Sequence, residues 1–126
     1  MKKIVHSDKA PAAIGPYSQA TICGDVIYVS GQLPIDPATG DLVQGDVAVQ
    51  TKQVMKNLEA ILEEAGTSVD KLLKTTILLT NMADFATMNE AYSSCLKGDP
   101  PARICYQVCA LPKGAIVEID AICALK

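Results

Sequence analysis

The chain has 126 residues, the length of one ordinary domain, and its 49% hydrophobic and 20% charged residues exclude disorder and low-complexity architecture. Eleven basic and fourteen acidic residues give a net charge of -3, and the basic residues form no stripe, so binding to nucleic acid is not expected. Aromatic residues make up only 4%, which leaves the core to aliphatic side chains and cysteines.

The N-terminus lacks the apolar run of a signal peptide, and no window approaches the ~20 apolar residues that a membrane span needs. We therefore expect a soluble, cytoplasmic protein without membrane contact, folded as one domain over residues 1–126. The five cysteines form no Cys-x-x-Cys pair, and the single His6 cannot build a metal site alone. We interpret the cysteines as small buried thiols and expect no metal.

The first strong pattern along the chain is a hairpin, preceded by a short strand at 3–5. Two runs, 17–23 and 26–30, flank Gly24-Asp25, a pair that suits a two-residue turn of the primed type. Pairing about this turn gives one apolar face, made of Ala20, Ile22, Ile27 and Val29. The opposite face is polar and consists of Tyr17, Gln19, Thr21, Tyr28 and Ser30.

A loop rich in Pro, Gly and Asp at 33–40 precedes the clearest helix of the chain. Asp46 is suited to cap this helix, apolar residues recur behind it at helical spacing, and Gly66 supplies a stop. The run 72–79 is β-branched and apolar, which predicts a central strand.

A second helix and two closing strands are expected after this central strand. Asp84 is suited to cap the helix, and Pro100-Pro101 would end it, because proline cannot continue the hydrogen-bond ladder. The apolar stripe of this helix is formed by Phe85, Met88, Tyr92 and Leu96. The closing strands are expected at 103–109 and 116–124, joined as a hairpin around Lys113.

This order of elements favours an α+β fold, a two-layer sandwich in which a mixed β-sheet carries two helices on one face. In the closing hairpin, Arg103, Cys105 and Glu118 share the face that the helices leave open. This face is either solvated or a subunit interface that encloses a pocket, and its Cys, Tyr, Thr and Ile content favours the interface. Arg103 either grips a small carboxylate ligand with its planar fork or pairs with Glu118 or Asp120.

Five motifs follow one another over nearly the whole chain: Gly15-Pro16-Tyr17-Ser18-Gln19-Ala20, Val29-Ser30-Gly31-Gln32-Leu33-Pro34, Gln50-Thr51 with Asn57-Leu58, Pro101-Ala102-Arg103 and Val117-Glu118-Ile119. In order and spacing they resemble the signatures of the RidA (YjgF) family of enamine/imine deaminases. The resemblance implies a chorismate-mutase-like α+β fold and a homotrimer with three active sites between subunits. It also implies that neither a metal nor an organic cofactor is needed.

The activity that the resemblance implies is hydrolysis of 2-imino acids, such as 2-iminopropanoate and 2-iminobutanoate, to 2-keto acids and ammonia. Such an enzyme clears reactive intermediates released by pyridoxal-phosphate enzymes. Arg103 would clamp the substrate carboxylate, while Glu118 and the backbone carbonyl of Cys105 would hold a water for attack on the C=N carbon. The resemblance further implies a pocket closed and lined by Tyr17, Ser30, Gly31 and Asn89.

A thiol nucleophile at Cys105 is the sharper alternative to this backbone role. No histidine is placed to activate the thiol, and a neighbouring Glu118 carboxylate would disfavour the thiolate, so we prefer the backbone role. The chain departs from the common pattern of the family at Cys95, Tyr106, Cys109 and Asp120. These departures concern the shape of the pocket and the preferred side chain of the imino acid.

Two functions of other classes stay open. Members of this family are also described as single-strand ribonucleases and translation inhibitors, although the charge of -3 and the few stacking aromatics argue against tight RNA binding. A non-enzymatic module that binds carboxylates, or a redox-responsive holdase, is the other alternative, because five cysteines are present.

Overall fold

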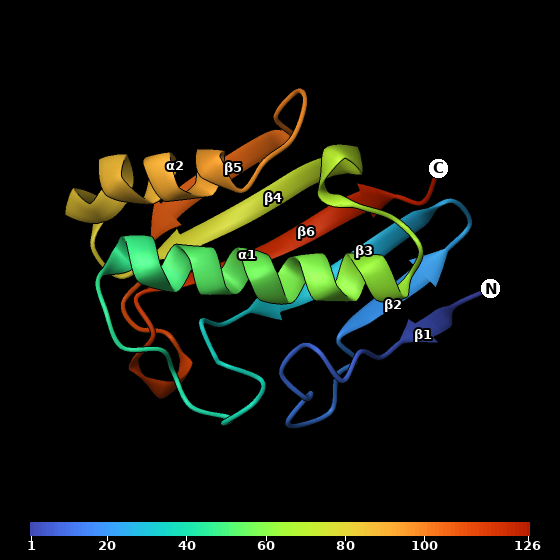
Figure 1. The fold of residues 1–126 in the computed structure, drawn as a ribbon, viewed down its shortest axis with the longest axis horizontal. Coiled ribbons are helices and arrows are strands. Elements are labelled where there is room, and N and C mark those ends of the chain that lie inside the picture. The colour runs from blue at the N-terminus through green and yellow to red at the C-terminus, as the bar shows by residue number, and fades with distance from the viewer.

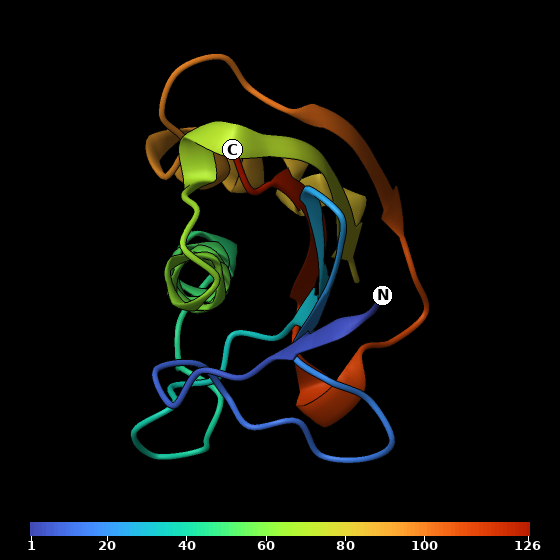
Figure 2. The same cartoon turned by 90° about the vertical axis from the view of Figure 1, so that its right-hand side faces the viewer.

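The computed structural model describes all 126 residues, and it confirms the two-layer α+β architecture (Figure 1). The helices are α1 (Val47–Glu64) and α2 (Phe85–Ser94), and the strands are β1 (Lys3–Val5), β2 (Ala20–Cys23), β3 (Val26–Gln32), β4 (Leu72–Leu79), β5 (Ala102–Gln107) and β6 (Val117–Ala124). Both helices lie on the same side of the sheet (Figure 2). Neither helix has the length and apolar character that crossing a membrane requires.

The strands form one mixed sheet in the order β1-β2-β3-β6-β4-β5, in which only β4 and β5 run parallel. The expected hairpin of β2 and β3 is confirmed, since Cys23 pairs with Val26 across the turn and Gly24 has φ 62. β2 begins only at Ala20. The Gln19 carbonyl still accepts from the Ser30 amide, but the chain before Gln19 forms a loop that the buried Gln19 side chain ties down.

The expected closing hairpin of β5 and β6 is wrong. β4 lies between these two strands, with β6 antiparallel on one side of it and β5 parallel on the other. The reason is the crossover through α2, which returns the chain to the same end of the sheet and so makes β5 parallel to β4. β6 then takes the free side of β4.

This pairing also reverses the faces expected for β5. Arg103 is registered with Thr75 and Cys105 with Ile77, both of which are fully buried under the helices. Arg103 and Cys105 therefore point to the helix side of the sheet, because a one-residue shift exchanges the two faces. Glu118 is on the open side, as expected, since its neighbours Val117 and Ile119 are fully buried.

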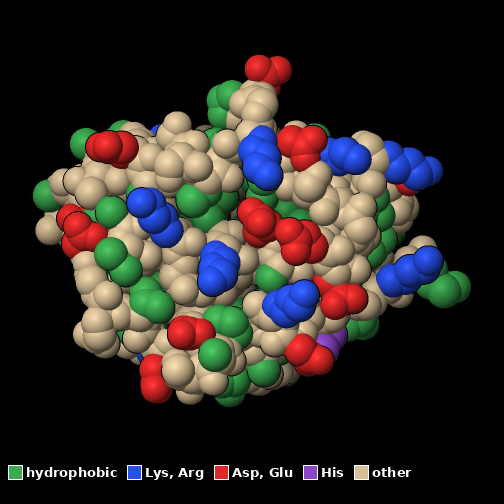
Figure 3. Space-filling model, viewed as in Figure 1, with side chains coloured by type: hydrophobic (Ala, Val, Ile, Leu, Met, Phe, Trp, Pro, Cys, Tyr) green, Lys and Arg blue, Asp and Glu red, His purple; other side chains and the backbone are tan.

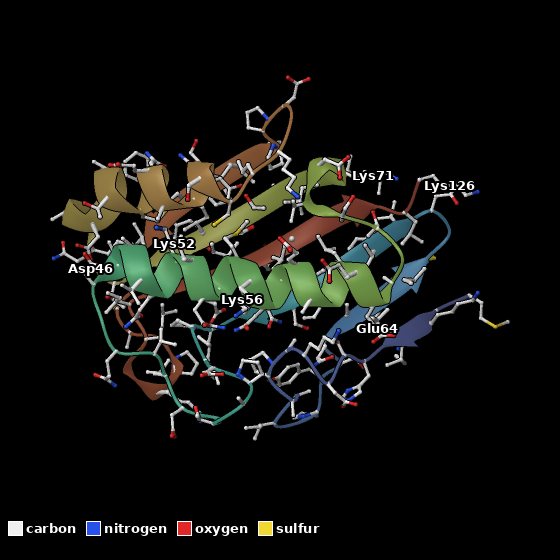
Figure 4. All side chains as sticks on the ribbon, viewed as in Figure 1. Asp46, Lys52, Lys56, Glu64, Lys71 and Lys126 are labelled. Atoms are coloured by element: carbon white, nitrogen blue, oxygen red, sulfur yellow. The ribbon has the colours of Figure 1, made fainter.

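The ends of α1 follow from the residues expected there. The Asp46 carboxylate accepts a hydrogen bond from the Val49 amide at 3.1 Å and caps the N-terminus, which Figure 4 labels. At the other end, the Thr67 amide donates to the Leu62 carbonyl and Gly66 has φ 83, the pattern of a Schellman motif.

The ends of α2 differ from the expected ones. A 3-10 turn, Met82–Asp84, runs directly into α2, so Asp84 already has helical backbone angles and its side chain makes no capping bond. Asn81 caps this turn instead by accepting from the Ala83 amide at 2.9 Å. The helix ends at Ser94, well before the two prolines, because the next two amides bond three residues back and tighten the last turn.

The core lies between the helices and the sheet. Most of its fully buried side chains are aliphatic or methionine and come from both layers, as in Val54, Leu58, Ile61, Ile77, Met88 and Ile119. The outer surface of the helix layer carries acidic and basic side chains interspersed over α1 and α2, with no single-sign patch (Figure 3). The open face of the sheet exposes large apolar side chains instead, since Tyr28, Ile104 and Tyr106 are each about half exposed, at 48%, 49% and 48%.

Candidate functional site

A cavity of about 520 Å³ opens at the end of β3, where the N-terminal loop, the loop after β3 and the turn before β6 meet. Its apolar walls include Pro11, Ile14 and Leu33. The polar groups that face it are those of Tyr17, Gln19, Ser30, Gln32, Lys113 and Glu118. Tyr17, Ser30, Gly31 and Glu118, which were expected to share a pocket, therefore do line one cavity.

A β-bulge at Ser30–Gly31 shapes the floor of this cavity. Val29 pairs with Ala121 and Gln32 pairs with Ile119, so two residues of β3 lie opposite the single Asp120 of β6. A Cβ atom on Gly31 would lie 2.9 Å from Cδ of Glu118. The Glu118 carboxyl group thus packs directly on the Gly31 backbone, a contact that only glycine allows.

Glu118 is half-buried, and its electrostatic surroundings disfavour its charge. Burial raises the pKa of its carboxyl group, and the Asp120 carboxylate raises it further. No salt bridge to Glu118 compensates within the chain, where the ion pairs join His6 to Asp8 and Lys126 to Asp25. A carboxylate in such a place is a stronger base than a solvated one, as general base catalysis requires.

Tyr17 and Ser30 are both held by backbone hydrogen bonds. The Tyr17 hydroxyl accepts from the Ile14 amide at 3.2 Å, and 51% of the residue is exposed at the mouth of the cavity. The Ser30 hydroxyl donates to the Ser18 carbonyl at 2.6 Å. Its proton is committed to that bond, so towards a ligand the Ser30 oxygen acts as an acceptor.

Gln19 was expected on the polar face of the first hairpin. In the structure it is buried and organises the N-terminal loop. It is only 2% exposed, and its amide group donates to the carbonyls of Ser7 and Pro11 and accepts from the Ser7 amide. The loop that carries Ile14 and Tyr17 is thus fastened to the start of β2. The only sequence signal for this role is that Gln19 directly follows Tyr17-Ser18 in the family motif.

Asn57, known from the sequence only as part of a motif, fastens the opposite wall of the cavity. It is fully buried in α1, and its side-chain amide donates to the carbonyls of Leu33 at 3.1 Å and Ile35 at 2.8 Å. Its carbonyl oxygen accepts from Gln53. The available signal was an asparagine within the apolar stripe of α1, where only a satisfied amide is tolerated.

Replacing Asn57 by alanine is expected to lower the free energy of unfolding by about 1–3 kcal/mol, because the buried Ile35 carbonyl loses its donor and the Leu33 carbonyl keeps only the Ile35 amide. Urea unfolding followed by circular dichroism measures this change. Gln53→Ala is the matched control, since it removes only the bond to Asn57, and it should cost less than about 1 kcal/mol. Equal losses for the two variants would contradict the role of Asn57 as the anchor of the loop.

Arg103, the only arginine of the chain, lies at the opposite side of the sheet from this cavity. It is exposed on the edge strand β5, and its Nη1 donates to Oδ1 of Asn89 at 2.5 Å. Its guanidinium carbon is 5.4 Å from the ring centre of Phe85 and 5.6 Å from that of Tyr92. The structure therefore places Arg103 with Asn89, and it separates both from Glu118 within one chain.

Cys105 accompanies Arg103 on β5. Burial raises the pKa of its thiol, and the nearby Arg103 charge only partly opposes this shift. The Val108 amide bonds to the Leu79 carbonyl of β4, so the strand alternation turns the Cys105 carbonyl towards the free edge. Arg103 and this carbonyl are both available to a neighbouring molecule at the edge.

The remaining cysteines are less buried than expected. Cys123 alone is buried, Cys95 is half-buried, and Cys23 and Cys109 are exposed. Cys23 is the last residue of β2, and Cys109 follows the end of the edge strand β5. At both places few neighbouring residues shield the side chain from solvent. No three His, Cys, Asp or Glu side chains come together as a group that could hold a metal ion.

Comparison with known proteins identifies the family. A family profile described as "Endoribonuclease L-PSP" matches residues 7–125. The chain is 51% identical over 122 residues to the 2-iminobutanoate/2-iminopropanoate deaminase of Mus musculus, covering 97% of this chain and 90% of that protein. Among solved structures it is similar to YyfA of the Rid protein family from Yersinia pestis, with a TM-score of 0.96, 49% identity and coverage of 98% and 99% of the two chains. It is also similar to E. coli TdcF with bound serine, with a TM-score of 0.93, 40% identity and coverage of 97% and 98%. With its fold and nearly its whole length matched, the chain belongs to the RidA (YjgF) family.

Proposed function

We propose that this protein is a hydrolytic deaminase that converts 2-imino acids to 2-keto acids and ammonia, at sites completed between the subunits of a homotrimer. The observation that carries the proposal is the division of polar groups in one chain. One side of the sheet offers a cavity with the Glu118 carboxyl group, whose pKa is raised, but no guanidinium, and the free edge offers Arg103 and a carbonyl away from that cavity. Each half supplies what the other lacks.

The surface of the sheet supports assembly. β5 is an edge strand with unpaired backbone groups, and its exposed Ile104 and Tyr106 belong to the open face of the sheet. Edges and apolar faces of this kind are normally covered in native proteins. A head-to-tail contact between the β5 edge of one protomer and the cavity of the next closes after three copies in a trimer, which leaves no face unpaired.

The proposed chemistry uses few groups. Arg103 of one protomer binds the substrate carboxylate with two parallel N–H donors and so fixes the C=N carbon in the cavity of the neighbour. Glu118, helped by the Cys105 carbonyl, orients a water and accepts its proton as the oxygen attacks this carbon. The same proton then passes to the imine nitrogen, which gives a carbinolamine. The hydroxyl proton of this intermediate moves through Glu118 to the amino nitrogen, the C–N bond breaks as the C=O bond forms, and ammonia and the 2-keto acid leave.

The named relatives support the substrate class. The mouse relative carries the name 2-iminobutanoate/2-iminopropanoate deaminase, and the similar TdcF structure contains serine. Serine shares with a 2-imino acid a carboxylate and a nitrogen on adjacent carbons. The proposal keeps the cytoplasmic location expected from the sequence, where such imines arise.

The proposal is tested by generating 2-iminobutanoate in place with an amino-acid oxidase and following its loss with and without the protein. We expect faster hydrolysis and a matching rise in 2-oxobutanoate. Hydrolysis at the uncatalysed rate over a range of protein concentrations would refute the deaminase. Cleavage of single-stranded RNA by the same preparation would instead support the activity in the family description.

The raised pKa of Glu118 has a consequence for stability. The protonated carboxyl group is favoured in the folded protein, so its stabilising effect is full below the ordinary pKa of 4.5 and is lost as pH rises through the raised folded pKa. Glu118→Gln, which mimics the protonated form, is therefore expected to melt at a higher temperature than the parent at pH 7.5. The difference should vanish below about pH 4.5.

Thermal unfolding of both proteins between pH 4 and pH 8 measures this effect. Asp120→Asn is the matched variant, because it removes the charge that adds to the effect of burial on the Glu118 pKa, and it should make the loss of stability smaller and complete at lower pH. If the difference in melting temperature between Glu118→Gln and the parent does not depend on pH, the surroundings of Glu118 do not raise its pKa.

A further inference from the structure

Arg103 is held by an arrangement that extends beyond its hydrogen bond to Asn89. The three side chains around it, Phe85, Asn89 and Tyr92, come from one face of α2, at spacings of four and three residues. α2 thus presents a ring, an amide oxygen and a second ring to a single guanidinium. We call Phe85, Tyr92 and Asn89 the arginine cradle.

The inner ring of the cradle is fixed from below. The Tyr92 hydroxyl lies 2.7 Å from the Thr75 hydroxyl, and both residues are buried, at 4% and 0% exposure. Thr75 is the residue of β4 that is registered directly with Arg103 of β5. The strand pair that carries the arginine therefore also anchors the ring against which it lies.

The Tyr92 hydroxyl remains a neutral hydrogen-bonding group in this place. Burial raises its pKa, and this outweighs the opposing effects of the Thr75 hydrogen bond and the Arg103 charge. The ring therefore offers its π-face to the guanidinium without forming a tyrosinate that would neutralise the cation. The attraction leaves the charge of Arg103 available to a ligand.

The cradle also leaves donors of Arg103 free. Nη1 donates to Asn89, and no other hydrogen bond or salt bridge engages the guanidinium within the chain. The edge formed by Nε and Nη2 can therefore take both oxygens of a carboxylate. An unrestrained arginine on an exposed edge strand would sample many rotamers. A ligand would then have to order the side chain as it binds, and this entropy cost would weaken binding.

We propose that Phe85, Tyr92 and Thr75 are positioning residues that hold Arg103, before any ligand arrives, in the conformation that binds the carboxylate of a 2-imino or 2-keto acid. The identity of the ligand rests on the proposed function, whereas the ordering of Arg103 is independent of it. Phe85 and Tyr92 thus have two roles, because they pack on the core and also fix the guanidinium.

The single arginine makes the ordering directly measurable. Protein labelled with ¹⁵N-arginine gives one Nε–H signal, whose relaxation reports the motion of this side chain alone. In the parent protein we expect restricted motion, with an order parameter near the rigid value of about 0.85. In Phe85→Leu, and in Tyr92→Phe, which keeps the ring but loses its tie to Thr75, the order parameter should fall.

Met88→Leu is the matched control, because it changes a fully buried side chain of the same helix by a volume-conserving swap and leaves the hydrogen bond and both ring contacts of Arg103 in place. It should leave the Nε–H order unchanged. Thr75→Val should lower the order as much as Tyr92→Phe, and the double variant no further, since both remove the same hydroxyl pair.

Binding of 2-oxobutanoate by calorimetry links the ordering to function. Phe85→Leu should weaken this binding about fivefold and raise KM with little change in kcat, because one cation–π contact is lost. Unchanged Nε–H order in Phe85→Leu and Tyr92→Phe, or lost order with unchanged affinity, would overturn the inference. If the parent shows the ordered arginine but binds no 2-oxobutanoate, the proposed function fails, and the ligand assigned to the cradle fails with it.

Discussion

Replacing Arg103 by alanine is expected to lower kcat/KM for 2-iminobutanoate by about 10²–10³-fold, because the bidentate grip on the carboxylate and the orientation that it provides are both lost. The side chain is exposed and lies on an edge strand, so the change in unfolding free energy should stay below about 1 kcal/mol. Steady-state kinetics with in-place imine generation, together with urea unfolding, separates the two effects.

Two further variants sharpen this result. Arg103→Lys keeps the positive charge but loses the planar fork, and it should still be at least about tenfold slower than the parent. Lys56→Ala removes an exposed cation from the middle of α1 (Figure 4) and should keep parental activity. If Arg103→Ala hydrolyses the imine as fast as the parent, Arg103 does not bind the substrate.

A single methyl group on Gly31 is expected to remove most of the activity while leaving the fold intact. The new Cβ would lie 2.9 Å from Cδ and 3.2 Å from Cγ of Glu118, so the carboxyl group has to move away. The side chain of Glu118 is flexible and reaches into a cavity, so this movement should cost less than about 1 kcal/mol of stability. A displacement of about 1 Å at a catalytic group lowers kcat by about 10²-fold.

A double-mutant cycle tests whether Gly31 acts through Glu118. Glu118→Gln alone should lower kcat strongly, and Gly31→Ala added to it should have little further effect, because the base is already gone. Additive losses would show that Gly31→Ala damages the cavity by another route. Full activity of Gly31→Ala would mean that the position of the Glu118 carboxyl group does not matter for catalysis.

The elements with local sequence signals were predicted well. α1 has a capping Asp46, an apolar periodicity and a terminal Gly66, and the hairpin of β2 and β3 has Gly24-Asp25 between two strand-forming runs. Each of these signals lies within a few residues of the structure it determines, so propensity and turn chemistry suffice.

The placement of β5 failed because its signals are not local. Strands that follow one another in sequence commonly form hairpins, whereas the true partner of β5 is β4, on the far side of a helix. β5 is also exposed on both faces in one chain, so its residues show no alternation that would reveal which side is covered. A strand–helix–strand order is the signal that favours the parallel pair.

The error of one register on β5 also gave the wrong face for Arg103 and Cys105. The family resemblance pointed to Arg103 and Glu118 as one site, while the hairpin placed them on one face of one chain. The structure puts them on opposite faces of the sheet, so one chain does not bring them together. Asn89, which was expected in the lining, accepts a hydrogen bond from Arg103.

The division of the site between protomers is tested most directly by mixing two inactive variants. Arg103→Ala and Glu118→Gln are unfolded together, refolded as mixed oligomers and assayed for imine hydrolysis. With random assembly at equal amounts, about a quarter of the sites combine an intact Arg103 with an intact neighbouring Glu118, so about a quarter of the parental activity should return. Mixed oligomers, verified by native mass spectrometry, that remain as inactive as either variant alone would contradict a site shared between protomers.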